Sequence, residues 1–99
     1  MVTVGILATF KVKPGLESEV ADFLRNALPL AEEKKDTTAW FAIKVDDNTY
    51  GIFDAFPSQD GRQAHLQGKI AAALMARAGE LFSEPPSISP VDVLAAKLP

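Results

Sequence analysis

Four stretches of the chain have the apolar spacing and composition of β-strands, and two longer stretches have those of helices. The polar loop from Asp46 to Thr49 separates two strand-like stretches and predicts a hairpin. Pro90 lies in the last stretch and predicts an edge strand, because proline cannot donate a hydrogen bond to a central ladder. The predicted strands are Val2–Val12, Thr38–Val45, Tyr50–Pro57 and Ser87–Leu98.

The predicted helices run from Leu16 to about Lys35 and from Ser58 to about Phe82, with apolar residues at intervals of three and four. Pro29 is expected to kink the first helix or end its regular part, since proline removes a helical hydrogen bond. Ser58 or Asp60 is expected to cap the second helix. The chain therefore alternates as strand, helix, strand, strand, helix, strand.

This order of elements predicts a single α+β domain, residues 1–99, with the ferredoxin-like βαββαβ arrangement. Right-handed crossovers place both helices on one side of a four-stranded antiparallel sheet. The strands then lie in the order fourth, first, third, second, which leaves the strand with Pro90 at an edge.

The predicted sheet is apolar on both faces. On the second strand Trp40 and Ala42 alternate with Phe41 and Ile43, so neither face is polar. Two helices can cover one face, and the other would expose a larger apolar patch than monomers usually tolerate. We therefore expect a homodimer in which two sheets pack face to face as a dimeric α+β barrel. The alternative is an apolar sheet that loops cover sparsely.

Composition and charge narrow the possible partners. Ten Lys+Arg and thirteen Asp+Glu give a net charge of −3 without a block of like charge, which argues against nucleic acid or an anionic membrane. The chain has no cysteine, which excludes disulfides and thiolate chemistry. No apolar run approaches the roughly 20 residues of a membrane helix, and the N-terminus lacks a signal-peptide pattern. We expect a soluble cytoplasmic protein.

Four segments carry a resemblance to a known family. ATFKVKPG, LESEVADFL and TAWFAIKV precede the hairpin loop, and FDAFPSQDGRQAHLQGKIAAAL follows it. In the last segment a strand ends in the aromatic Phe56, a short turn follows, and Ala64, His65 and Leu66 lie on the next helix. Together these segments resemble the antibiotic biosynthesis monooxygenase (ABM) family of dimeric α+β barrel proteins, over nearly the whole chain.

The resemblance implies a homodimer with a small hydrophobic pocket between sheet and helices in each subunit. Some family members oxidise aromatic polyketides with molecular oxygen and without metal, flavin or haem, and others degrade haem. Haem-degrading members carry an Asn on the first strand and a Trp on the second helix. This chain has no Asn between Val2 and Val12, and its only Trp, Trp40, lies on a predicted strand. The Asn–Trp–Tyr set of polyketide-oxidising members is also unmatched. We therefore do not expect haem degradation, and we expect no cofactor.

His65 and Asp54 are the candidate catalytic residues. His65 is the only histidine, and an imidazole can take up or release a proton near neutral pH. Its alternative role is a structural cap or a subunit contact. Asp54 lies within an apolar strand, so its carboxylate needs a partner such as His65 or Arg62. The alternative is a structural ion pair with Arg62, Lys11 or Lys44. One histidine without cysteine predicts no metal site.

The candidate substrate-binding residues are five aromatic residues on or next to the hairpin strands and one arginine. Aromatic rings stack on flat ligands, although such residues more often belong to a core or a dimer interface. Arg62 is a candidate for holding an anionic group, and its alternative is a solvated side chain. The aromatic candidates are Trp40, Phe41, Tyr50, Phe53 and Phe56.

These residues support two hypotheses of different classes. The first is a cofactor-independent monooxygenase-like enzyme that binds a small aromatic or quinone-type compound in a hydrophobic pocket, with His65 assisting its deprotonation. The second is a non-catalytic dimer that binds a small hydrophobic ligand, or a stress-associated protein of the same fold. A cavity beside His65 with polar atoms pointing into it favours the first hypothesis.

Overall fold

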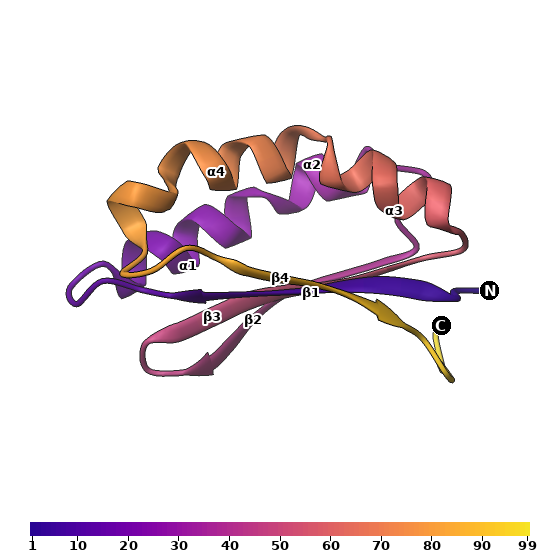
Figure 1. Ribbon diagram of the computed structural model, residues 1–99, viewed down its shortest axis with the longest axis horizontal. Helices are drawn as coiled ribbons and strands as arrows, with labels where there is room; N and C mark the ends of the chain where they lie inside the picture. The colour runs from indigo at the N-terminus through magenta and orange to yellow at the C-terminus, as the bar shows by residue number, and fades with distance from the viewer.

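The computed structural model describes residues 1–99 and consists of a four-stranded antiparallel sheet with all its helices on one side (Figure 1). This is the predicted α+β ferredoxin-like fold. In chain order the elements are β1 (Val4–Lys11), α1 (Glu17–Asn26), α2 (Leu28–Glu32), β2 (Ala39–Asp46), β3 (Thr49–Phe56), α3 (Gln59–Leu66), α4 (Lys69–Leu81) and β4 (Ser87–Asp92). None of the helices combines the length and the apolar composition of a membrane-spanning segment.

The strands lie in the order β2-β3-β1-β4, so the predicted order is confirmed. β1 and β3 form the centre of the sheet, and β4, which contains Pro90, lies at an edge. In the register Ile6 of β1 lies opposite Asp54 of β3 on one side and opposite Pro90 of β4 on the other. Because opposite residues point to the same face of a sheet, all three side chains point towards the helices.

The first predicted helix is interrupted at Ala27, where α1 ends and α2 begins. Pro29 lies in the first turn of α2, where a helix does not need the missing N–H group. The prediction that the regular helix ends near Pro29 is therefore confirmed.

The second predicted helix is two helices, so the prediction of one continuous helix from Ser58 was wrong. Gly68 adopts extended backbone angles, φ −90° and ψ −174°, and stands at the N-cap of α4. The preceding turn closes with short-range bonds, because the Gln67 and Gly68 N–H groups donate to the Ala64 and His65 carbonyls. Glycine's low helix propensity makes this a favourable place for a break. Ser58 is the N-cap of α3, but its side chain makes no capping hydrogen bond.

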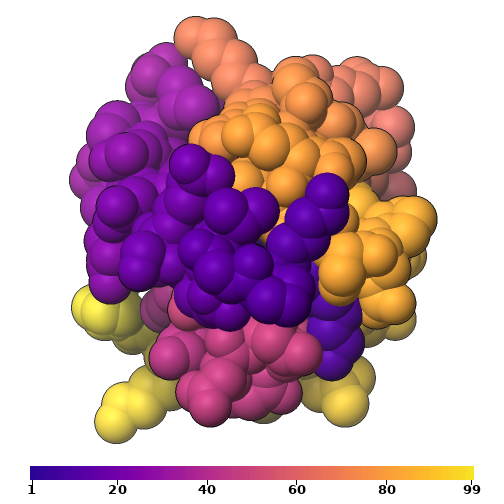
Figure 2. Space-filling model, turned by 90° about the vertical axis from the view of Figure 1, so that its left-hand side faces the viewer, coloured from indigo at the N-terminus to yellow at the C-terminus, as the bar shows by residue number.

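The last strand is shorter than predicted, because β4 ends at Asp92 rather than at Leu98. Asp92 lies opposite Val4, the first residue of β1, so a longer β4 has no strand to pair with. One further bond joins the Val93 N–H to the Thr3 carbonyl. The C-terminal residues after β4 protrude on the side of the sheet away from the helices (yellow in Figure 2).

The hydrophobic core lies between the sheet and the helices. Phe10 of β1 stacks on Phe82, which follows α4, with ring centroids 4.9 Å apart. The fully buried Val20 and Leu81 complete the packing of α1 and α4 on the sheet. This layer accounts for the inward-facing apolar residues of β1 and β3, as the alternation predicts.

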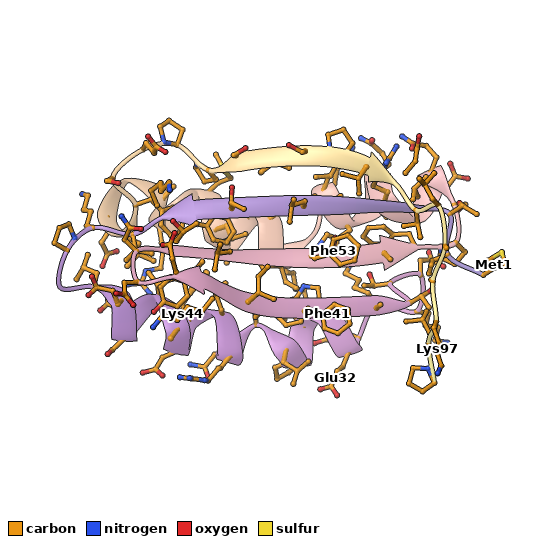
Figure 3. All side chains as sticks on the ribbon, turned by 90° about the horizontal axis from the view of Figure 1, so that it is seen from below. Met1, Glu32, Phe41, Lys44, Phe53 and Lys97 are labelled. Carbon is orange, nitrogen blue, oxygen red and sulfur yellow. The ribbon has the colours of Figure 1, made fainter.

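The other face of the sheet is apolar and has no helix on it (Figures 1 and 3). Phe41 of β2 and Phe53 of β3 lie side by side there with ring centroids 6.5 Å apart, and Phe41 is 51% exposed. Leu7 of β1 and Val45 of β2 are further exposed apolar residues of the sheet. The sequence thus correctly predicts that apolar residues occupy both faces, while the dimeric barrel stays a prediction.

Candidate functional site

A buried carboxylate and a buried imidazole meet beneath α3. Asp54 of β3 is 1% exposed and His65, in the last turn of α3, is 8% exposed. His65 Nε2 lies 2.8 Å from Asp54 Oδ2, a distance that makes an ion pair when the imidazole is protonated. A buried carboxylate without such a partner would be strongly unfavourable. Of the partners expected for Asp54, the structure therefore places His65 beside it and not Arg62.

The local packing fixes this pair from both sides. Asp54 points inward from the centre of the sheet, and the Phe56 ring, on the same strand and face, lies 5.4 Å from the His65 ring at an angle of 47°. Gly61 lets α3 lie close to the segment that contains Asp36, because a Cβ at position 61 would lie 3.1 Å from the Asp36 side chain.

A cavity of about 120 Å³ opens beside the pair, between the sheet and the helices α3 and α4. Asp54 and His65 are the only polar residues in its lining. Leu66, Met75 and Ile88 are lining residues that are also exposed, so the cavity reaches the surface between these helices and β4. The complete lining is Ile6, Ala8, Ile52, Asp54, His65, Leu66, Ile70, Ala71, Leu74, Met75, Pro86 and Ile88.

Arg62 is bound to the protein backbone and does not line the cavity. Its Nη1 donates to the Gly5 carbonyl at 3.3 Å and to the Val91 carbonyl at 3.1 Å. A third bond joins Nη2 to the Gln59 side chain. The guanidinium therefore ties α3 to β1 and β4.

The five aromatic candidates do not gather in one wall. Phe41 and Phe53 belong to the uncovered face of the sheet. Tyr50 and Phe56 are buried on the inward face, and Trp40 is partly buried there. None of the five lines the cavity beside His65.

Most of the cavity wall comes from residues that sequence reasoning assigned to the core or did not single out. Ile70 and Leu74 are among the apolar residues at helical spacing that predict the second helix, and both are buried in α4. Met75, Pro86 and Ile88 join the lining only because α4 lies over the edge strand. No sequence pattern marks such a gap between a helix and an edge strand.

The fold is that of known structures at low sequence identity. A structure from Nitrosomonas europaea, described as a putative antibiotic biosynthesis monooxygenase, is 11% identical with a TM-score of 0.81, and the match covers 93% of this chain and 90% of that one. A structure with the same description from Caulobacter crescentus is 18% identical with a TM-score of 0.80, covering 95% and 92%. No family model and no curated protein matches the sequence.

A second protein from Nitrosomonas europaea, a protein of unknown function, is much more similar. It is 55% identical, its crystal structure gives a TM-score of 0.97, and the match covers 100% of this chain and 96% of that chain. The chain belongs to the same family as this protein.

Proposed function

We propose that the protein is a cofactor-independent monooxygenase-like enzyme that acts on a small hydroxylated aromatic or quinone-type compound. The observation that carries the proposal is the Asp54–His65 pair, which supplies the only polar residues of an otherwise apolar cavity. A buried titratable pair in a pocket is typical of acid–base sites. The two neighbours described as antibiotic biosynthesis monooxygenases support the same class of reaction.

The cavity limits the size of the substrate. Its volume is about 120 Å³, and a cavity of about 150 Å³ in another protein accommodates benzene. The substrate of this proposal therefore has one ring rather than several fused rings. Because no lysine or arginine lines the cavity, a neutral compound fits it better than a carboxylate or a phosphate ester.

The pair would act as a general base. When the His65 Nε2 hydrogen is directed at Asp54, the lone pair of the neutral ring lies on Nδ1. In the proposed reaction this nitrogen takes the proton of the substrate hydroxyl, and Asp54 stabilises the resulting imidazolium. The apolar walls exclude water and leave an electron-rich phenolate that reacts with molecular oxygen.

The reaction balances without an added reductant. For a phenol, one ring C–H becomes a carbonyl and the hydroxyl becomes a second carbonyl, so the product is a quinone. One atom of the oxygen molecule enters this product, and the other leaves as water with the two hydrogens removed from the substrate. The substrate itself supplies all the electrons.

The proposal includes a homodimer. The uncovered face carries Phe41, Phe53 and Val45, and a second copy of the same sheet is a self-complementary cover for it. The cavity lies on the opposite side of the sheet, so dimerisation would leave its mouth accessible.

An oxygen-uptake screen over single-ring phenols and hydroquinones tests the proposal. We expect uptake above the spontaneous rate with at least one compound, and loss of that uptake in His65→Ala. Gln63→Ala, an exposed residue of the same helix, is the matched control and should keep the parent rate. Failure of every compound to raise oxygen uptake would contradict the enzymatic proposal.

A non-catalytic binding protein is the second candidate. It is favoured by the 2.8 Å contact between His65 Nε2 and Asp54 Oδ2, since such a contact holds α3 on the sheet without any part in a reaction. Under this candidate single-ring phenols bind in the cavity, oxygen uptake is absent, and Asp54→Asn lowers thermal stability.

A further inference from the structure

Two buried side-chain atoms of the protein have no hydrogen-bond partner, Trp40 Nε1 and Asp54 Oδ1. They belong to residues that lie directly opposite each other on β2 and β3. Buried polar atoms are nearly always paired, so two orphans on one cross-strand pair are an unusual coincidence.

The two atoms are chemically complementary. An indole N–H can only donate, and a carboxylate oxygen can only accept. Both side chains point to the helix-covered face, and directly opposite residues have Cβ atoms about 4.5–5.5 Å apart. Yet they do not hydrogen-bond to each other. An oxygen that accepts one hydrogen bond and donates another would satisfy both.

We propose that Trp40 Nε1 and Asp54 Oδ1 form a binding site for one bridging O–H group, and that Trp40 is thereby a positioning residue for Asp54. Such a group accepts from the indole and donates to the carboxylate. It is a buried water, or the hydroxyl of a bound ligand. The water is the better fit to the ligand-free protein, because Trp40 does not line the cavity that His65 lines.

The bridge would fix the orientation of the carboxylate. Asp54 Oδ2 faces His65, so a partner on Oδ1 prevents the carboxylate from turning about its χ2 angle. The pair would then present His65 to the cavity in one orientation. The bridging site itself does not depend on the proposed function; only its effect on turnover does.

A high-resolution crystal structure tests the site directly. We expect an ordered oxygen within hydrogen-bonding distance of both Trp40 Nε1 and Asp54 Oδ1. An oxygen present in the ligand-free crystal identifies the bridging group as a buried water. An oxygen that appears only after soaking with phenol identifies it as the hydroxyl of a bound ligand. A direct contact between the two atoms, or an empty gap both with and without phenol, overturns the proposal.

NMR gives an independent test, because the chain has one tryptophan and one histidine. In the parent protein we expect a magnetisation-transfer peak between the indole N–H and bound water. Trp40→Phe keeps a ring but removes the donor, so the pH midpoint of the His65 titration should shift relative to the parent. If the protein is an enzyme, kcat should fall about tenfold, the lower end of what loss of an orienting partner costs at metal sites. A folded Trp40→Phe with an unchanged midpoint overturns the positioning role, whether or not the protein has activity.

Discussion

Phe41 of β2 and Phe53 of β3 stack on the face of the sheet that no helix covers, with ring centroids 6.5 Å apart and ring planes 15° apart (Figure 3). Directly opposite aromatic residues stabilise a strand pair, but half of the Phe41 side chain is left in solvent. Aromatic residues that are exposed in a free subunit are enriched in protein–protein interfaces, where the partner buries them. The pair is therefore the feature by which the proposed homodimer is best tested.

Phe41→Ser should weaken self-association at least tenfold, because truncating a hot-spot residue at the centre of an interface costs about 2 kcal/mol or more of binding free energy. Sedimentation equilibrium over a range of concentrations measures this constant. Leu28→Ser is the matched control, since Leu28 is similarly exposed, at 46%, but lies on the helical layer. A parent protein that stays monomeric at high concentration would contradict the homodimer.

Gly5→Ala should destabilise the fold and disturb Asp54. A Cβ at Gly5 would lie 2.6 Å from the Asp54 carbonyl oxygen and 3.3 Å from the Val91 side chain. Forcing an extra carbon into such packing costs about 1–3 kcal/mol, and urea unfolding measures it. Gly79→Ala is the control, because nothing lies within 4 Å of its Cβ position and alanine favours a helix by about 1 kcal/mol. Equal effects of the two substitutions would show that β1 tolerates the added carbon.

Ala71→Leu should block ligand binding without unfolding the protein. Ala71 lines the cavity, and a longer side chain there would extend into space that is already empty. We expect affinity for single-ring phenols, measured by calorimetry, to fall more than tenfold. Ala72→Leu, on the exposed side of the same helix, should bind like the parent. Unchanged affinity in Ala71→Leu would place the ligand elsewhere.

Much of the fold follows from residue patterns, and the exceptions have physical reasons. Alternation in β1 and β3 is a local property, and it correctly predicts which side chains face the helices. The break at Gly68 is not visible in the periodicity, because apolar residues continue at helical spacing on both sides of it. The end of β4 depends on where β1 begins, which the sequence of β4 does not contain.

The candidate site could be predicted only in part. Asp54 is conspicuous because a carboxylate in an apolar strand needs a partner, and His65 is conspicuous as the only histidine. Their meeting depends on the turn that follows Phe56 and on the close approach of α3 at Gly61. The cavity depends on how α4 lies over β4, and the position of the unpaired Trp40 N–H beside Asp54 depends on the strand register. Neither arrangement can be predicted from a short stretch of sequence.

Asp46→Ala should lower stability in a pH-dependent way. The Asn48 backbone N–H donates to Asp46 Oδ1 at 3.1 Å, and this bond, with a smaller contribution from Thr49, lowers the pKa of Asp46 below its ordinary value. A carboxyl group whose pKa is lowered by folding stabilises the folded state above its unfolded pKa, and this contribution disappears as pH falls through the folded pKa. The stability difference between parent and variant should therefore shrink in acid, as urea unfolding at several pH values would measure. A difference that stays constant would show that the charge of Asp46 is unimportant.

Asp54→Asn and His65→Gln should each abolish activity while leaving the cavity intact. Both replacements keep the approximate shape of the side chain, but His65→Gln removes the base and Asp54→Asn removes its charged partner. In serine proteases the replacement of the orienting aspartate by asparagine lowers kcat about 10⁴-fold. We expect kcat to fall at least 100-fold, with phenol affinity within a few-fold of the parent. Comparable turnover by the two variants and the parent would remove the pair from the mechanism.

Oxygen-isotope labelling tests the central claim most directly. A phenol that supports oxygen uptake is converted under ¹⁸O₂, and the product is examined by mass spectrometry. A reaction at the Asp54–His65 pair as proposed places one labelled atom in the quinone and the other in water, and His65→Gln yields no labelled product. A product without label, or labelling equal in the parent and His65→Gln, would contradict the account.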